Sequence, residues 1–311
     1  MSALVHEALM YEGLDEFLEG TSAFVNEGLA AGETVVVAVP EPRLTALRDR
    51  LDGPTEHLGF MDMAELGRNP ARIIPTLRNV LDANPGRRLR WVGEPVWPGR
   101  RPCENVEGER HEALLNVAFA DVPVSILCPY DVGGLDPTVL VGAQRTHPVL
   151  HASGRRWDSV LYGDPSTVAQ AAAHPLDPVP PTADERRVDH DLYGLRLFVR
   201  DRASAAGLDG ARLDDLLLAA NEAAANTLLH GGGRGVLRIW RDDDDVLCEI
   251  ADGGRLDDPL AGRRAPDTAQ AGGRGLWLMN QLCDLVEIRP TTQGLTVRLH
   301  MGLEPAVEQV A

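Results

Sequence analysis

Two polar residues in the second half of the chain have types and spacing suited to phosphate chemistry. Glu222 and Asn226 belong to the segment NEAAANTLLHG, residues 221–231. Residues four apart on a helix share one face, so the carboxylate and the carboxamide lie side by side. The amide oxygen is a hard ligand suited to Mg²⁺, and the carboxylate can take a proton from an attacking hydroxyl or water. Taken alone, the pair also fits an ordinary solvated helix face.

Two glycine-containing clusters follow, and both suit a bound nucleotide. In EIADGG, residues 249–254, Asp252 ends a predicted strand, where it can accept a hydrogen bond from an exocyclic amine while the glycines admit a flat base. In GGRGLWLM, residues 272–279, glycines open a helix whose free N–H groups favour phosphate. A plain strand-end turn is the alternative for the first cluster. A dinucleotide-binding fold would need the second cluster earlier in the chain.

In this order, the clusters resemble the N, G1 and G2 boxes of the GHKL (Bergerat-fold) ATPases over residues 188–302. Those proteins bind ATP without a P-loop. All 30 basic residues here are arginine, and the missing lysine excludes P-loop enzymes and protein kinases with a strand lysine. The phrases NEAAANTLLHG and GGRGLWLMNQLCDLVE look most like the anti-sigma-factor (RsbW-like) branch of the superfamily.

That resemblance implies roles for individual residues. Asn226 would ligate Mg²⁺, Glu222 would be the catalytic base, and Asp252 would recognise the adenine amine of ATP. The residues expected to shape the lid, residues 255–271, and the phosphate loop are Gly254, Gly273 and Gly275, with Arg274 reaching toward the phosphates.

Elements that alternate in type make up the first half. Helical patterns cover residues 14–31, 42–51, 70–83, 104–119 and 136–146, and strand patterns cover 34–39, 57–62, 89–93 and 122–127. Such alternation predicts an α/β fold with a mostly parallel sheet and helices on both faces. For the second half, the resemblance implies a GHKL α/β sandwich.

A proline-rich stretch at residues 163–187 separates the halves, because clustered prolines prevent a continuing helix. The predicted organisation is a first domain at 1–165, a linker at 166–187, the domain that resembles the ATPases at 188–303 and a tail at 304–311. Within the second half, strands are expected at 192–199, 235–241, 246–251, 285–289 and 294–300, and helices at 200–206, 212–230 and 276–285. The acidic run at 242–245 is expected to form a hairpin tip rather than a metal site. Four adjacent carboxylates repel one another, and alternate side chains on a strand point to opposite faces.

Five short segments of the first half resemble the MEDS sensory domain. They are HEALMY at 6–11, WVGEPVW at 91–97, HEALLN at 111–116, CPYD at 128–131 and THP at 146–148. A MEDS domain joined to an anti-sigma-type ATPase domain is similar to the RsbA family of anti-sigma regulators in actinobacteria.

A candidate sensory pocket follows from strand ends in the first half. Glu94 and Asp131 lie at or just after the C-termini of predicted strands, which is where open α/β sheets bind ligands. His111, Cys128 and His147 would converge there as metal ligands, with Tyr130 nearby, although their spacing matches no standard zinc pattern. A regulatory pocket for a small molecule and purely structural roles are the alternatives.

Composition narrows the class of protein further. No segment has the roughly 18 consecutive apolar residues of a membrane span, and the N-terminus has no signal-peptide pattern. The net charge of −17 disfavours nucleic acid and favours basic protein partners. The four cysteines form no CxxC pair, which fits a reduced cytoplasm.

The resemblance implies a cytoplasmic anti-sigma factor with ATP-dependent serine-kinase activity, regulated through its sensory domain. By resemblance its partners are a sigma factor and a STAS-domain anti-anti-sigma protein, its cofactors are ATP and Mg²⁺, and it is a homodimer. Two alternatives stay open. One is a sensor histidine kinase, although His190 lies in a short linker before a predicted strand. The other is a module in which ATP sets partner affinity and no phosphate is transferred.

Overall fold

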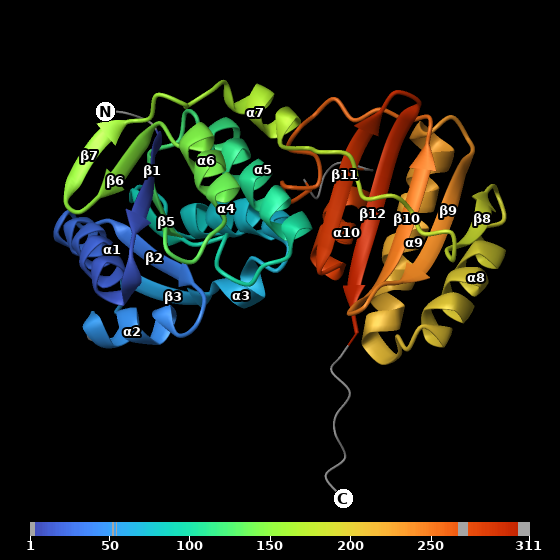
Figure 1. Cartoon of the computed structure of the whole chain (residues 1–311), viewed down its shortest axis with the longest axis horizontal. Coiled ribbons are helices and arrows are strands. Elements are labelled where there is room, and N and C mark those ends of the chain that lie inside the picture. Colours follow the sequence, from blue (N-terminus) through green and yellow to red (C-terminus); the bar gives the residue numbers. More distant parts are fainter. Residues whose placement is uncertain (1–3, 52, 54, 267–272, 304–311) are drawn as a thin grey trace, which may run out of the picture. The chain divides into compact units, whose positions relative to one another are not determined.

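The structure, a computed structural model, describes residues 4–51, 53, 55–266 and 273–303. The chain divides into two compact units, Met1–Ala173 and His174–Ala311 (Figure 1). The predicted tail, residues 304–311, and the part of the predicted lid at 267–271 lie outside the described residues. Within the described part of the chain, no helix has the length and apolar character needed to cross a membrane.

The first unit is built on a seven-stranded sheet in the order β3-β2-β4-β5-β1-β6-β7. All neighbouring strands are parallel except β6 and β7, which are antiparallel. The strands are β1 (Leu4–Tyr11), β2 (Thr34–Val39), β3 (Leu58–Asp62), β4 (Leu89–Gly93), β5 (Val124–Asp131), β6 (Val149–Ala152) and β7 (Arg155–Asp158). The predicted parallel-rich sheet is therefore confirmed, and β1, β6 and β7 are additions to it.

Helices cover both faces of this sheet. Successive residues of β1 point to opposite faces, and Leu9 and Tyr11 pack in one apolar core with Phe17 of α1. On the other face, His6 contacts Glu112 of α5. The helices are α1 (Gly13–Ala30), α2 (Arg43–Arg50), α3 (Met63–Leu66), the 3₁₀ helix η1 (Pro70–Arg72), α4 (Ile73–Ala83), α5 (Pro102–Ala118), α6 (Pro137–Thr146) and α7 (Pro165–Ala171).

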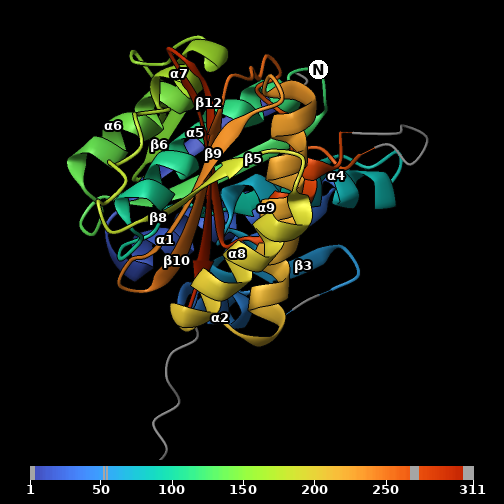
Figure 2. The same cartoon turned by 90° about the vertical axis from the view of Figure 1, so that its right-hand side faces the viewer.

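The second unit has an antiparallel sheet in the order β11-β12-β10-β9-β8. Its helices share one apolar core with the sheet, and α8 and α9 lie side by side in both views (Figures 1 and 2). The elements are β8 (Asp184–Val188), α8 (Leu192–Ala205), α9 (Gly210–His230), β9 (Gly235–Arg241), β10 (Asp245–Asp252), α10 (Gly275–Leu282), β11 (Leu285–Thr291) and β12 (Gly294–Gly302). This arrangement is consistent with the predicted ATPase fold.

The strand prediction for residues 192–199 was wrong, because these residues begin the helix α8. Its buried residues Leu195, Val199 and Ala203 recur every four positions, which is a helical period. Asp191 caps this helix by accepting a hydrogen bond from the Gly194 N–H at 2.8 Å. The strong β-propensity of the tyrosine, phenylalanine and valine side chains hid this period in the sequence.

The first strand of the second sheet along the chain is β8. All of its residues except Val188 belong to the stretch that was predicted as a linker. It pairs antiparallel with β9 at the edge of the sheet. Earlier in the same stretch, the backbone carbonyls of His174 and Asp177 accept hydrogen bonds from Arg289 and Arg298 at 2.8 Å. These contacts hold residues 174–188 against the second unit. The first three residues of the acidic run, 242–244, form the β9–β10 turn, and Asp245 begins β10.

A substitution in the core of the second unit tests whether the two units have independent apolar cores. Leu216 on α9 is fully buried, so Leu216→Ala should lower the free energy of unfolding of this unit by about 2–5 kcal/mol. Hydrogen exchange on the full chain should then show faster exchange in α8, α9, β10 and β12 and unchanged protection in β1, β4 and β5. Leu218→Ala, on the exposed side of the same helix, is the control and should change little. Equal loss of protection in both units would contradict independent cores.

Candidate functional site

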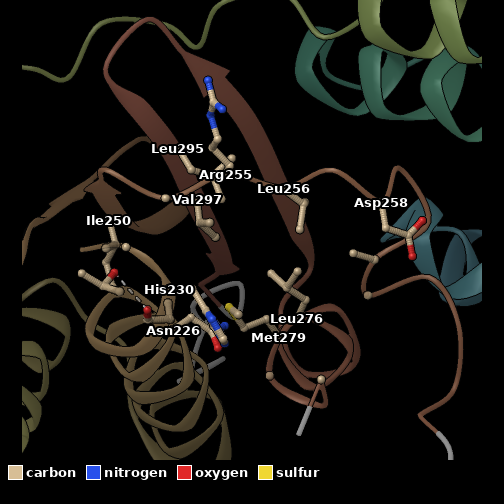
Figure 3. Close-up of a pocket in the computed structure, with 18 of the residues that line it drawn as sticks. Asn226, His230, Ile250, Arg255, Leu256, Asp258, Leu276, Met279, Leu295 and Val297 are labelled. Carbon is tan, nitrogen blue, oxygen red and sulfur yellow. Dashed lines mark hydrogen bonds between the residues drawn. The ribbon is translucent and has the colours of Figure 1, made fainter. Parts of the chain in front are cut away.

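A cavity of about 570 Å³ lies in the second unit, lined by residues of α9, α10, β10 and β12 (Figure 3). Figure 3 shows apolar side chains that line it, among them Ile250, Leu276, Met279 and Val297. This volume lies in the range typical of small-molecule sites, in which apolar walls and a few polar groups fix the ligand. The cavity therefore suits a flat, partly apolar ligand with polar substituents.

Asp252 is held in one orientation at the side of this cavity. The Thr227 hydroxyl donates to Oδ2 at 2.5 Å, and the Gly254 N–H donates to Oδ1 at 2.8 Å. Each carboxylate oxygen has two lone pairs, so Asp252 can still accept from an amine on a ligand. Glycine is needed around this side chain, since a Cβ on Gly231 would lie 2.5 Å from Asp252 Cγ.

Glu222 and Asn226 meet the N-terminus of α10 where Gly275 begins it. A Cβ on Gly275 would lie 3.0 Å from Asn226 Nδ2 and 3.1 Å from Glu222 Oε2, so only glycine allows this approach without displacing them. Asn226 lines the cavity, whereas Glu222 is not among its described lining residues. The fold thus joins two predicted clusters that are about 50 residues apart in the sequence.

Of the other predicted nucleotide-site residues, two line the cavity and one does not. Gly254 and Gly273 line the cavity, and Gly273 adopts a positive φ of 76° that favours glycine. Arg274 is exposed at the N-cap of α10 and is not among the described lining residues.

Sequence reasoning missed several residues around the cavity. Thr227 and Gly231 were visible inside the first motif, next to the residues that were assigned. Asn280 had no sequence signal: it donates to the Gly262 carbonyl at 3.0 Å and so ties the described part of the lid segment to α10.

In the first unit, the predicted sensory-pocket residues separate into two groups. Glu94 is fully buried and accepts hydrogen bonds from the Tyr11 hydroxyl at 3.0 Å and from Arg43 Nε at 2.9 Å. Burial raises the pKa of Glu94 to about 7, although the Arg43 charge opposes the shift, and the Asp131 charge adds to the increase. Glu94 and Asp131 thus act electrostatically on each other, as expected at neighbouring strand ends.

The second group consists of Cys128, Tyr130 and His147, together with His6 and Glu112, all buried. The ring of Tyr130 stands edge-on to that of His147, at 5.6 Å between centroids. Burial and the Glu112 charge raise the pKa of the Cys128 thiol. His111 is buried but is not part of this cluster, because its neighbour Glu112 occupies the helix position that faces β1 and β5. The predicted three-residue ligand set is therefore corrected: Cys128 and His147 converge with His6 and Glu112.

Comparison with protein-family models assigns both units. Residues 5–148 match the MEDS model, described as the methanogen/methylotroph, DcmR sensory domain. Residues 187–301 match the model of the histidine kinase-like ATPase domain. The chain is a MEDS sensory domain followed by a histidine kinase-like ATPase domain. The predicted pair of domains is confirmed, and the cavity lies in the ATPase domain.

Comparison with individual proteins adds less. No curated protein matches the chain. Among solved structures, one that is similar is the crystal structure of the RsbU and RsbW domains of Rv1364c from Mycobacterium tuberculosis, with 20% identity and a TM-score of 0.31. The match covers 42% of this chain and 34% of that chain, so this chain spans about a third of its length.

The buried Glu94 of the MEDS domain should make the stability of this domain depend on pH. The folded state keeps the Glu94 proton up to about pH 7, whereas an unfolded glutamate loses it near pH 4.3. This contribution is complete below the unfolded pKa and is lost as the pH rises toward 7.

We therefore expect the Tm of the wild-type domain, minus that of Glu94→Gln, to fall between pH 5 and pH 7.5. Glutamine keeps the shape of the side chain and does not titrate in this range. Scanning calorimetry of both proteins across this pH range measures the difference. A constant difference would show that Glu94 stays ionised beside Arg43.

Proposed function

We propose that the chain is an ATP-binding anti-sigma factor of the serine-kinase type. It would hold a sigma factor through its ATPase domain and phosphorylate a serine on a STAS-domain partner. The observation that carries the proposal is the cavity with Asp252 fixed on one side and with Asn226, Glu222 and Gly275 meeting beside it. The partner assignment rests on the likeness of the first and third motifs to the RsbW-like branch.

The described residues fit ATP by their chemistry. Asp252 would accept a hydrogen bond from the adenine amine, and Ile250 and Met279 would contact the base. The N–H groups at the start of α10 would hold phosphate oxygens, because a helix N-terminus favours negative charge. Asn226 would ligate Mg²⁺ through its amide oxygen. ATP would supply the γ-phosphoryl group, and Mg²⁺ would neutralise its charge.

Glu222 would act as the general base in this arrangement. It lies one helical turn before Asn226, on the same face and next to the α10 N-terminus. Glu222 would accept the proton that the partner's serine hydroxyl loses as its oxygen bonds to the γ-phosphorus. The bond from that phosphorus to the β–γ bridging oxygen would break, and ADP would leave with that oxygen. Most of the rate would come from positioning and electrostatic stabilisation.

The MEDS domain would supply the input to this activity. A small-molecule signal bound in that domain would change how the ATPase domain holds its protein partners. The proposal places the protein in the cytoplasm as a homodimer, as in the family it resembles. Its net charge of −17 suits basic surfaces on protein partners rather than nucleic acid.

A module that binds ATP without transferring phosphate is the second candidate function. It is favoured by the absence of Glu222 from the described lining of the cavity. A histidine kinase is less consistent with the structure. His190 is exposed in the short turn between β8 and α8, and the described residues of the second unit include no long helical hairpin before it.

Replacing the proposed base separates the first two candidates. Glu222→Gln should slow phosphate transfer to the STAS partner by about 10²–10⁴-fold, the usual contribution of a general base, and leave the Kd for ATP within about threefold. Radiolabelled transfer and equilibrium nucleotide binding measure the two quantities. Asp214→Asn, an exposed position on the same helix, is the control. Wild-type transfer by Glu222→Gln would remove the assigned role, and no transfer by the wild type would favour the binding module.

Replacing the residue proposed to recognise adenine tests the ATP site itself. Asp252→Asn should raise the Kd for ATP about 10–100-fold, because a hydrogen bond to a charged group contributes about 1.5–3 kcal/mol. Asp258→Asn is a matched control, since Asp258 lines the same cavity but is exposed. Isothermal titration with ATP gives both constants. Equal affinity in the two variants would place adenine elsewhere.

A further inference from the structure

Four side chains that could bind a metal ion meet inside the MEDS domain. They are His6 on β1, Glu112 on α5, Cys128 on β5 and His147 directly after α6. Their ligand atoms all lie within 4.8 Å of one another, and each residue is at most 1% exposed. The cluster therefore lies in the interior of the first unit, and no described part of the nucleotide cavity belongs to it.

The fold brings these residues together from distant parts of the chain. In the parallel pair β1–β5, Ala8 lies opposite Cys128, and His6 is on the same face as Ala8 because side chains alternate. α5 covers this face and directs Glu112 toward it, with Asn116 one turn later on the same side. The C-terminus of α6 then places His147 against His6, at 4.1 Å between ring centroids.

Hydrogen bonds determine which nitrogen of His6 carries the proton. The Asn116 amide donates through Nδ2 to the Thr146 carbonyl at 2.8 Å, so its Oδ1 faces His6 Nδ1 at 3.1 Å. Oδ1 can only accept, and His6 Nδ1 must therefore donate. The ring is buried, and burial favours the uncharged form of an imidazole. Nε2 of His6 consequently presents a lone pair.

His147 has the same tautomer for a different reason. Its Nδ1 lies 2.8 Å from the backbone carbonyl of Ala143, which can only accept. Nδ1 therefore carries the proton, and Nε2 presents a lone pair. This Nε2 lies 3.4 Å from Glu112 Oε2, and the Nε2 of His6 lies 3.0 Å from the same oxygen.

Two nitrogen lone pairs thus point at one carboxylate in a space closed to water. The Cys128 thiol, 3.3 Å from Glu112 Oε2, has one proton to offer, and Glu112 Oε1 has no hydrogen-bond partner. Buried acceptors without donors are costly. A cation between them would satisfy all four groups at once.

We propose that His6, Glu112, Cys128 and His147 together bind one zinc ion. Two imidazoles, a thiolate and a carboxylate form a donor set typical of Zn²⁺, and the sulfur disfavours Mg²⁺ and Ca²⁺. Zinc bonds of about 2.0–2.3 Å place tetrahedral ligands roughly 3.3–3.8 Å apart. Four of the six separations between the ligand atoms are 3.0–3.5 Å, and all six are within 4.8 Å. Zn²⁺ with two anionic and two neutral ligands is also electrically neutral, as a buried site requires.

The proposed site is closed and acts as a structural clamp. All four positions around the ion are protein ligands, as in structural rather than catalytic zinc sites. Asn116 is the positioning residue that orients His6, a second contact of the kind that commonly supports ligating histidines. The ion would tie β1 and β5 to α5 and α6.

The test measures metal in the untagged full-length protein expressed in zinc- or cobalt-supplemented medium. We expect about one zinc ion per chain after dialysis by elemental analysis. The cobalt form should show a thiolate-to-cobalt charge-transfer band. Cys128→Ser should abolish that band, and His147→Gln should lower retained metal at least tenfold. Asn116→Ser should weaken binding about 10–100-fold while keeping the band.

Matched controls separate this site from others in the chain. Cys248→Ser removes a buried thiol of the ATPase domain, and His111→Gln removes the histidine next to Glu112; both should keep the metal and the band. Wild-type protein that retains no zinc and shows no cobalt band would overturn the proposal, since it does not depend on any variant folding. Retention of the metal in Cys128→Ser and His147→Gln would also overturn it, because the ion would then lie elsewhere.

Discussion

A carboxylate that is buried or partly buried must find donors or a cation, and each candidate functional cluster of this protein depends on that constraint. Asp252 receives the Thr227 hydroxyl and the Gly254 N–H. Glu94 receives Tyr11 and Arg43. Glu112 instead faces two imidazole nitrogens and a thiol. The first two carboxylates are satisfied by the fold itself, whereas the third gives the clearest reason to expect an ion.

In the ATPase domain, a single helix builds both the core and the site. The buried side of α9 contributes Leu216, Ala220 and Ala223 to the apolar core. One turn further along, Asn226 reaches the cavity and Thr227 holds Asp252. Small residues are common on this helix because α10 and the sheet approach it closely. Positioning of the site is therefore a consequence of core packing, and a change in one is expected to affect the other.

Sequence reasoning predicted features that depend on local interactions and missed those that depend on contacts between distant segments. Periodicity identified most helices and strands of the MEDS domain, because it reports local burial. It was wrong at residues 192–199, where strong β-propensity concealed a helical period. It also missed β8, a short and largely exposed edge strand in a proline-rich context. His111 was chosen over Glu112 and His6, because sequence alone does not show which side of α5 faces the sheet.

The sequence by itself determined the two domain types, the α/β class and the motifs around Glu222, Asp252 and Gly275. These depend on residue types at short spacing, which local chemistry and resemblance reveal. Only the tertiary structure decided that Gly275 abuts Asn226, that Glu94 pairs with Tyr11 and Arg43, and that His6 joins Glu112, Cys128 and His147. Strand register and helix rotation determine these side-chain contacts, and both arise from packing between segments far apart in the chain.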